Sequence, residues 1–246
     1  MRPRLSVGDT LNEVFSIYGR HAGLLLPIAF WLFLLVAVVE GLAGSSLALF
    51  ALFVVASGIA ATLYQGMVVG LVRDLEEGRR EPSFSDLYGN AAPVLLPLIG
   101  AGLLAGVGIG IGTALLILPG LFLLTIWAVI APVIVIEGSG VLDSFARSQE
   151  LVRGNGWPVF WVVIIVFLIS VIGSLLFGQI AAAVADGPLV RIVFSALAAT
   201  ITAPINAIAA GVLYYRLLAL SKRSRPSGVS SDSASGSGST TTSEVK

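Results

Sequence analysis

Residues 87–136 read LYGNAAPVLLPLIGAGLLAGVGIGIGTALLILPGLFLLTIWAVIAPVIVI, fifty residues without a single Asp, Glu, Lys or Arg. A transmembrane helix needs about 20 apolar residues, so this run is too long for one span and fits two spans joined by a turn. Proline is tolerated in the first turn of a helix and glycine relaxes the backbone, which makes Leu118-Pro119-Gly120 the predicted turn. The stretch therefore predicts a helical hairpin inside a membrane.

Four further uncharged runs surround this hairpin, each long enough for one more span: 22–39, 41–72, 154–185 and 192–215. The chain is 57% hydrophobic and only 11% charged, whereas soluble domains carry about 25% charged residues. The runs are continuous and do not alternate as the strands of a membrane barrel do. The predicted fold class is an all-α, polytopic membrane protein with six transmembrane helices.

The basic residues set the predicted orientation. With six spans, thirteen of the fourteen Lys and Arg residues fall on one face and only Arg191 falls on the other. Cytoplasmic segments of membrane proteins are enriched in Lys and Arg. Treating 87–136 as one span would instead leave seven basic residues on each face. We therefore expect a multi-pass protein of the cell (cytoplasmic) membrane with both termini in the cytoplasm.

A charged segment interrupts the apolar runs between Glu137 and Trp157. Apolar side chains recur there at helical spacing between Val141 and Val152, while the charged side chains share another face. This pattern predicts a helix lying in the cytoplasmic membrane interface. We call this interfacial helix, with the turn that follows it, an elbow. Gly154 is expected to end the helix, and Trp157 to begin the next span at headgroup depth.

Similar elbows precede two other spans. Residues 18–28 and 88–98 share six of eleven positions, and 154–159 is a partial third copy. In the first copy, Thr10 and Glu13 are expected to form the capping box of a separate helix. The alternative is chance, because many membrane helices begin with glycine and a polar residue.

The repeat interpretation predicts three parallel units, each an interfacial helix followed by a helical hairpin: 5–72, 82–136 and 139–219. Together they form one membrane domain over 1–220. Residues 221–246 are rich in Ser, Gly and Thr, and such a composition predicts a disordered cytoplasmic tail.

The second half of the chain carries several motifs of a known family: Pro119-Gly120, Glu137-Gly138, the elbow residues Ser148, Leu151, Gly154 and Trp157, and Leu213-Tyr214-Tyr215. These resemble the bacterial and archaeal membrane domain named after glycerophosphoryl diester phosphodiesterases, and the related YciC-like uncharacterised integral membrane proteins. The resemblance implies a membrane domain without an assigned activity. Phosphodiesterase catalysis needs a soluble barrel with a metal site of carboxylates and histidines, and His21 is the only histidine here. No enzymatic activity is expected.

Three polar residues are the nearest to the membrane interior: Gln65, Gln179 and Asn206. Polar residues inside a membrane line pathways or form hydrogen bonds between helices. Because the spans carry no buried charge, hydrogen bonding is favoured, and a pathway remains the alternative.

Gly102, Gly106 and Gly110 follow one another at a spacing of four residues in the third span. Small residues at this spacing let helix backbones approach closely in lipid. We predict that this stripe packs against the fourth span, which the short turn holds nearby.

The predicted function is a non-catalytic scaffold, assembly factor or regulator of membrane proteins or lipids. The rival class is a transporter or channel for a small or lipidic substrate, which would bring Gln65, Gln179 and Asn206 together around a polar cavity. The expected partners are the lipid bilayer and other membrane proteins, with no nucleic acid and no cofactor. The sequence leaves the oligomeric state open.

Overall fold

A computed structural model describes residues 5–43, 47–78, 89, 92–184 and 187–224. Its elements are all helical: α1 (Val7–Ala43), α2 (Leu47–Glu76), the 3-10 helix η1 (Ala92–Val94), α4 (Leu95–Leu115), α5 (Ile117–Ile126), α6 (Ile130–Glu137), α7 (Val141–Val152), α8 (Gly156–Val184) and α9 (Pro188–Ser224). Within this part of the chain, six helical segments are long and apolar enough to cross a membrane, with α5 and α6 together forming one of them. The predicted all-helical membrane class is confirmed.

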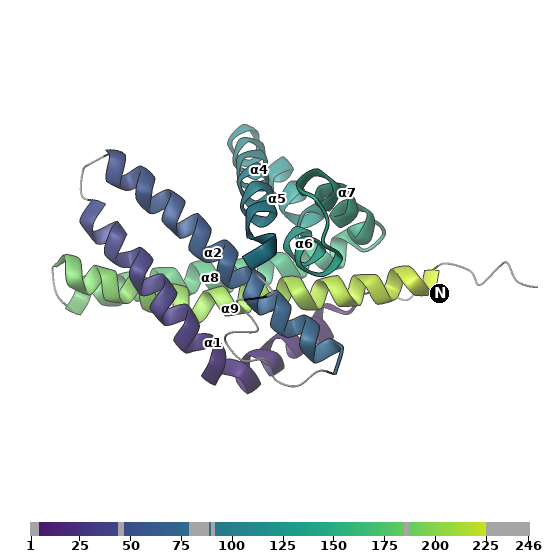
Figure 1. Cartoon of the computed structure of the whole chain (residues 1–246), viewed down its shortest axis with the longest axis horizontal. Helices are drawn as coiled ribbons and strands as arrows, with labels where there is room; N and C mark the ends of the chain where they lie inside the picture. The colour runs from purple at the N-terminus through teal and green to yellow at the C-terminus, as the bar shows by residue number, and fades with distance from the viewer. Residues whose placement is uncertain (1–4, 44–46, 79–88, 90–91, 185–186, 225–246) are drawn as a thin grey trace, which may run out of the picture.

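The long helices α8 and α9 lie side by side along the longest axis of the molecule (Figure 1). Helix α1 makes its most extensive packing with α9 rather than with its sequence neighbour α2. Helices α4 to α7 gather on one side of this arrangement (Figure 1). The first and last helices are thus packed together and close the bundle.

The main core lies between α1, α2, α8 and α9, where Val14, Val68, Val162 and Ile208 are completely buried. The outward faces are also apolar; Leu96, for example, is 79% exposed. Lipid offers no hydrophobic drive for helix association, so close packing and hydrogen bonds between helices must hold such a bundle together.

The interfacial helix predicted at the start of the chain is not a separate element and stays a prediction. Helix α1 is one helix from Val7 to Ala43, and it bends along its length (Figure 1). Helix α7, by contrast, is bounded by Gly138 and Gly154, whose φ angles are +66° and +89°. Glycine adopts such left-handed conformations readily and stops a helix there. Gly19 takes no positive φ, so the helix continues through it. In the first unit the predicted elbow and span are thus joined in one helix, whereas in the third unit α7 and α8 are separate helices. The repeat stays a prediction.

The beginning of α1 also differs from the prediction. The Ser6 hydroxyl accepts a hydrogen bond from the Asp9 N–H at 3.3 Å. Thr10 lies inside the helix, and its hydroxyl donates to the Ser6 carbonyl at 2.7 Å. The capping residue is therefore Ser6, not Thr10, and the Glu13 side chain is used elsewhere, in an ion pair with Arg216.

The 87–136 run contains two span-length helical segments as predicted, but the turn lies earlier. Leu116 is extended (φ −160°, ψ 137°) between α4 and α5. Pro119 falls in the first turn of α5, a position where its missing N–H costs nothing. The turn therefore precedes the Leu118-Pro119-Gly120 sequence.

The predicted packing role of Gly106 and Gly110 is wrong. A Cβ added at either residue would meet no atom within 4 Å in the described part of the chain, and at Gly102 it would only reach Thr62 of α2 at 4.0 Å. The close approach to α5 is made by Gly112, where an added Cβ would lie 3.2 Å from Gly120. The glycines that face the following segment are therefore Gly108, next to Trp127, and Gly112, next to Gly120.

Two predicted segments fall largely or partly outside the described residues. The second elbow, at about 82–91, does so except for Gly89. Of the predicted tail 221–246, the first four residues continue α9 to Ser224 and the remainder lies outside the described part.

Candidate functional site

The elbow helix α7 docks on a break in the neighbouring span. Three residues, Trp127 to Val129, separate α5 from α6. Pro132 explains the break, because in a continuous helix its ring would clash with the Ala128 carbonyl four residues earlier. The phenyl ring of Phe145 in α7 packs edge-on against the Trp127 indole at a centroid distance of 4.9 Å. The break therefore provides a surface on which α7 packs.

Ser148 satisfies a backbone group that this break exposes. The Ile130 N–H donates to the Trp127 carbonyl at 3.3 Å, and not to the Ile126 carbonyl that a continuous α-helix would use. The buried Ser148 hydroxyl donates to the Ile126 carbonyl at 2.8 Å. A buried backbone carbonyl without a hydrogen-bond partner costs free energy, so this bond satisfies a group that the break would otherwise leave unpaired.

Glu137 connects three helices at the end of α6. Its carboxylate accepts hydrogen bonds from Arg147 Nε of α7 at 3.0 Å and from the Tyr214 hydroxyl of α9 at 2.8 Å. Arg147 also donates to Glu150 at 2.8 Å. The Glu137 and Glu150 carboxylates raise the pKa of the Arg147 guanidinium above its already high usual value, mainly through these hydrogen bonds. The junction is therefore a charged cluster that fixes helix positions.

A second ion pair joins the two ends of the membrane domain. Arg216 in α9 binds the Glu13 carboxylate of α1 at 2.6 Å and donates to the Asp9 carbonyl at 3.0 Å. Charge-assisted hydrogen bonds are about twice as strong as neutral ones. This contact holds the first turns of α1 against the last turns of α9.

The other elbow residues complete the turn into α8. Gly154, with φ +89°, follows the end of α7, as predicted. The Asn155 side-chain oxygen accepts a hydrogen bond from the Leu5 N–H at 3.4 Å. Trp157 is 69% exposed at the beginning of α8 and stacks on Phe160 with ring centroids 5.4 Å apart. Its predicted headgroup depth stays a prediction.

The three polar residues predicted near the membrane interior do not share one site. Gln65 is half-buried on α2, and Gln179 is exposed on α8. The Asn206 amide of α9 donates to the Ser170 hydroxyl of α8 at 2.7 Å and to the Thr202 carbonyl at 2.9 Å. For Asn206, the hydrogen-bonding role between helices is the one observed.

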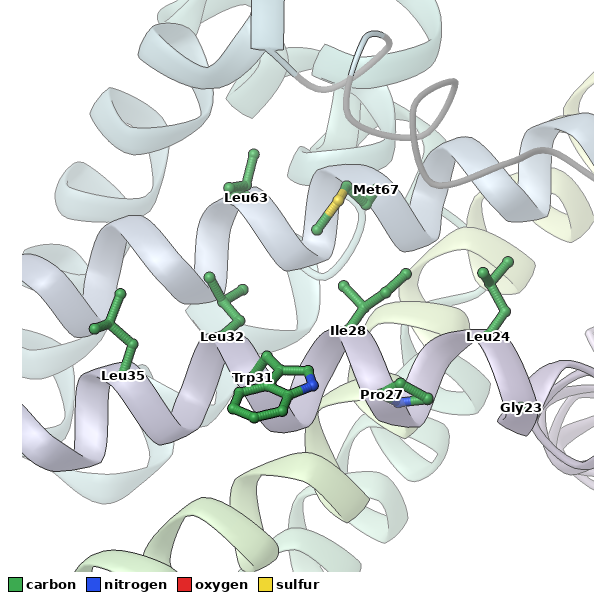
Figure 2. A pocket seen from close by; sticks show the side chains of 9 residues that line it. All are labelled: Gly23, Leu24, Pro27, Ile28, Trp31, Leu32, Leu35, Leu63 and Met67. Atoms are coloured by element: carbon green, nitrogen blue, oxygen red, sulfur yellow. The ribbon is translucent and has the colours of Figure 1, made fainter.

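An apolar groove of about 540 Å³ lies between α1 and α2. Figure 2 shows Leu32 and Ile28 of α1 pointing toward α2 and Met67 of α2 pointing toward α1. Trp31 and Leu63 complete this part of the lining. Its lining side chains carry no charge, so it offers surface for an apolar group and no means of acid–base chemistry. It contains none of the three predicted polar residues.

The described residues contain no group of three or more His, Cys, Asp or Glu side chains arranged to hold a metal ion. In the polar clusters, Arg147, Arg216 and Tyr214 donate hydrogen bonds to carboxylates. Arg216 and Ser148 also donate to backbone carbonyls. Such an arrangement positions helices relative to one another.

The partners of the candidate residues were not predicted. Glu137 and Ser148 bind Tyr214 and the Ile126 carbonyl, and Glu13 pairs with Arg216. These pairs are separated by 77, 22 and 203 residues. The only available signal was the scarcity of charge, since an isolated charge in an apolar chain needs a partner.

Six span-length apolar helices, packed through small residues and interhelical hydrogen bonds, define the class: this is a multi-pass membrane protein. The family model described as "Domain of unknown function (DUF7847)" matches residues 5–219, so the chain belongs to that family. Comparison with curated proteins and with solved structures finds no match. The resemblance to the membrane domain named after glycerophosphoryl diester phosphodiesterases stays a prediction.

Proposed function

We propose that this protein is a non-catalytic scaffold, assembly factor or regulator that acts through contacts inside the membrane. The observation that carries the proposal is the Asn206–Ser170 hydrogen bond. In it, one of the three polar side chains predicted near the membrane interior joins α9 to α8, which is the use that hydrogen bonds between membrane helices serve in a packed bundle.

The charged groups support the same proposal. Glu137 with Arg147, and Glu13 with Arg216, are arranged as links between helices. The apolar faces of α4 and α8 remain outward, with Val107 at 59% and Leu175 at 60% exposure. Such faces contact lipid or the transmembrane helices of other proteins. In this proposal the chain forms three hairpins in the cell membrane, α7 lies in the cytoplasmic interface, and both termini are cytoplasmic.

The test is crosslinking in intact membranes. A photoreactive amino acid placed at Val107, on the outward face of α4, should capture discrete partner proteins or specific lipids. The matched control is the same amino acid at Val133, which is completely buried and should give no intermolecular product.

A flux assay separates the proposal from transport. The purified protein in liposomes should carry no solute above protein-free vesicles. A flux that Asn206→Ala abolishes, without loss of folded protein, would favour the transporter or channel class over the scaffold.

A further inference from the structure

A cavity of about 580 Å³ opens between the C-terminal part of α8 and the N-terminal part of α9. Ligand sites in proteins commonly enclose about 300–1,000 Å³. The two helices touch closely where Gly173 faces Thr202, whose methyl group lies 3.1 Å from an added Cβ. From this contact toward the start of α9 the two helices line the cavity, and Thr202 marks the inner end of the cavity.

The cavity has one cationic side chain. Arg191 of α9 contributes to its lining and is exposed, and among the described residues it makes no ion pair or side-chain hydrogen bond. Arginine within a membrane span is costly unless it is paired or reaches the interface. In the proposed orientation it is also the one basic residue on its face of the membrane. A guanidinium that has no ion-pair partner in the described part of the chain, and that lies beside a cavity of ligand size, is suited to hold an anion.

The inner part of the cavity is amphipathic. Hydroxyls of Ser195 and Thr202 line it, and both donate to carbonyls of their own helix, at 3.1 and 2.9 Å. The aromatic rings of Phe177 and Phe194, with centroids 6.4 Å apart, and several alanines form the remaining wall. Small residues leave width for an apolar chain, and the rings give it contact area.

We propose that this cavity binds an anionic amphiphile: a carboxylate or phosphate head at Arg191, with one acyl chain entering between α8 and α9. The lining thus offers a cation near the start of α9, and aromatic, hydroxyl and small apolar side chains along the following turns. The site stands independently of the scaffold role, since a scaffold and a transporter could each hold this ligand.

The test titrates purified protein in neutral detergent with defined probes and counts bound molecules by native mass spectrometry. Oleate and phosphatidylglycerol are the anionic probes, and oleyl alcohol and phosphatidylcholine are the chain-matched probes without net negative charge. We expect one saturable anionic ligand per chain. Arg191→Gln should weaken its binding by about tenfold, the loss of one strong charge-assisted contact, while Arg191→Lys retains part of the affinity.

The matched control is Arg153→Gln, which removes an exposed arginine next to α7, and it should change the affinity by less than about twofold. Ala198→Leu, which fills the cavity from a buried position, should weaken binding of the same probes in protein that elutes as the parent does. Preference for oleate identifies a fatty acid, and preference for phosphatidylglycerol identifies a membrane lipid. Equal binding of charged and uncharged probes, or equal losses in Arg191→Gln and Arg153→Gln, would overturn the proposal.

Discussion

The Ser148 hydroxyl lies 2.8 Å from the Ile126 carbonyl and donates a hydrogen bond to it across the break between α5 and α6. The break is a consequence of Pro132, and the carbonyl it leaves without its usual helical donor lies where the elbow helix packs. A hydroxyl on the elbow thus compensates a backbone defect in the span beside it. The elbow and the broken span are therefore parts of one structural unit.

Removing this hydroxyl should destabilise the protein. Ser148→Ala leaves the Ile126 carbonyl without its donor, and an unsatisfied buried polar group costs about 1–3 kcal/mol. The free energy of unfolding in mixed micelles of neutral detergent and dodecyl sulfate measures the loss. Ser16→Ala is the control, because Ser16 is exposed on α1, and it should lie within about 0.5 kcal/mol of the parent. An unchanged Ser148→Ala protein would contradict the role assigned to the hydroxyl.

Glu137 should tolerate loss of charge better than loss of its oxygens. Glu137→Gln keeps an acceptor for the Tyr214 hydroxyl and should cost about 1 kcal/mol, whereas Glu137→Ala removes the bonds to Tyr214 and Arg147 and should cost about 2–3 kcal/mol. Glu150→Gln is the matched control, since the Glu150 side chain is 62% exposed and its pair with Arg147 adds little. Equal stability of the two Glu137 variants would show that charge alone matters there.

The number of span-length helices was predictable because it depends on the length of uncharged runs. Where helices stop was harder to predict. Gly19 and Gly154 both precede apolar runs, yet only Gly154 adopts a positive φ. The choice depends on what the flanking segments pack against, and local sequence does not contain that information. The break in α5–α6 was encoded by Pro132, but its importance became visible only with the Ser148 contact.

The site was predictable only in part, for a similar reason. Ser148 and Glu137 were recognised through a motif, whereas their partners lie on other helices. The error at Gly106 has a geometric cause. Glycines recur in α4 both at Gly106 and two residues later at Gly108, and two residues correspond to a rotation of about 200° around a helix. Spacing identifies stripes of small residues, but only packing decides which stripe faces inward.

The Arg216–Glu13 pair should couple the two ends of the domain. A double-mutant cycle with Arg216→Gln and Glu13→Gln should give a coupling energy of about 1 kcal/mol, because both side chains are nearly one-third exposed and partly screened. The readout is the free energy of unfolding of the four proteins. Strictly additive losses would mean that each residue acts through other contacts.

The glycines of the α4–α5 hairpin should respond in opposite ways to an added methyl group. Gly120→Ala places a Cβ 2.8 Å from the Thr113 backbone nitrogen, and overpacking of this kind costs about 1–3 kcal/mol. Gly106→Ala meets nothing within 4 Å and should be neutral or slightly stabilising, because alanine favours a helix. Thermal unfolding in detergent compares the two variants. If Gly106→Ala proves the more harmful, the outward face of α4 is occupied by a partner or a second copy.

The proposed orientation is tested best at exposed positions. The chain has no cysteine, so each introduced cysteine is unique. Ser148 is buried, and its protection from a reagent would say nothing about sidedness. Gln149→Cys, on the exposed side of α7, should resist an impermeant maleimide in intact cells and react after lysis, because basic segments stay in the cytoplasm. Leu189→Cys, 75% exposed at the start of α9, should react without lysis. The reverse pattern would place α7 outside the cell and invert the assignment of both termini.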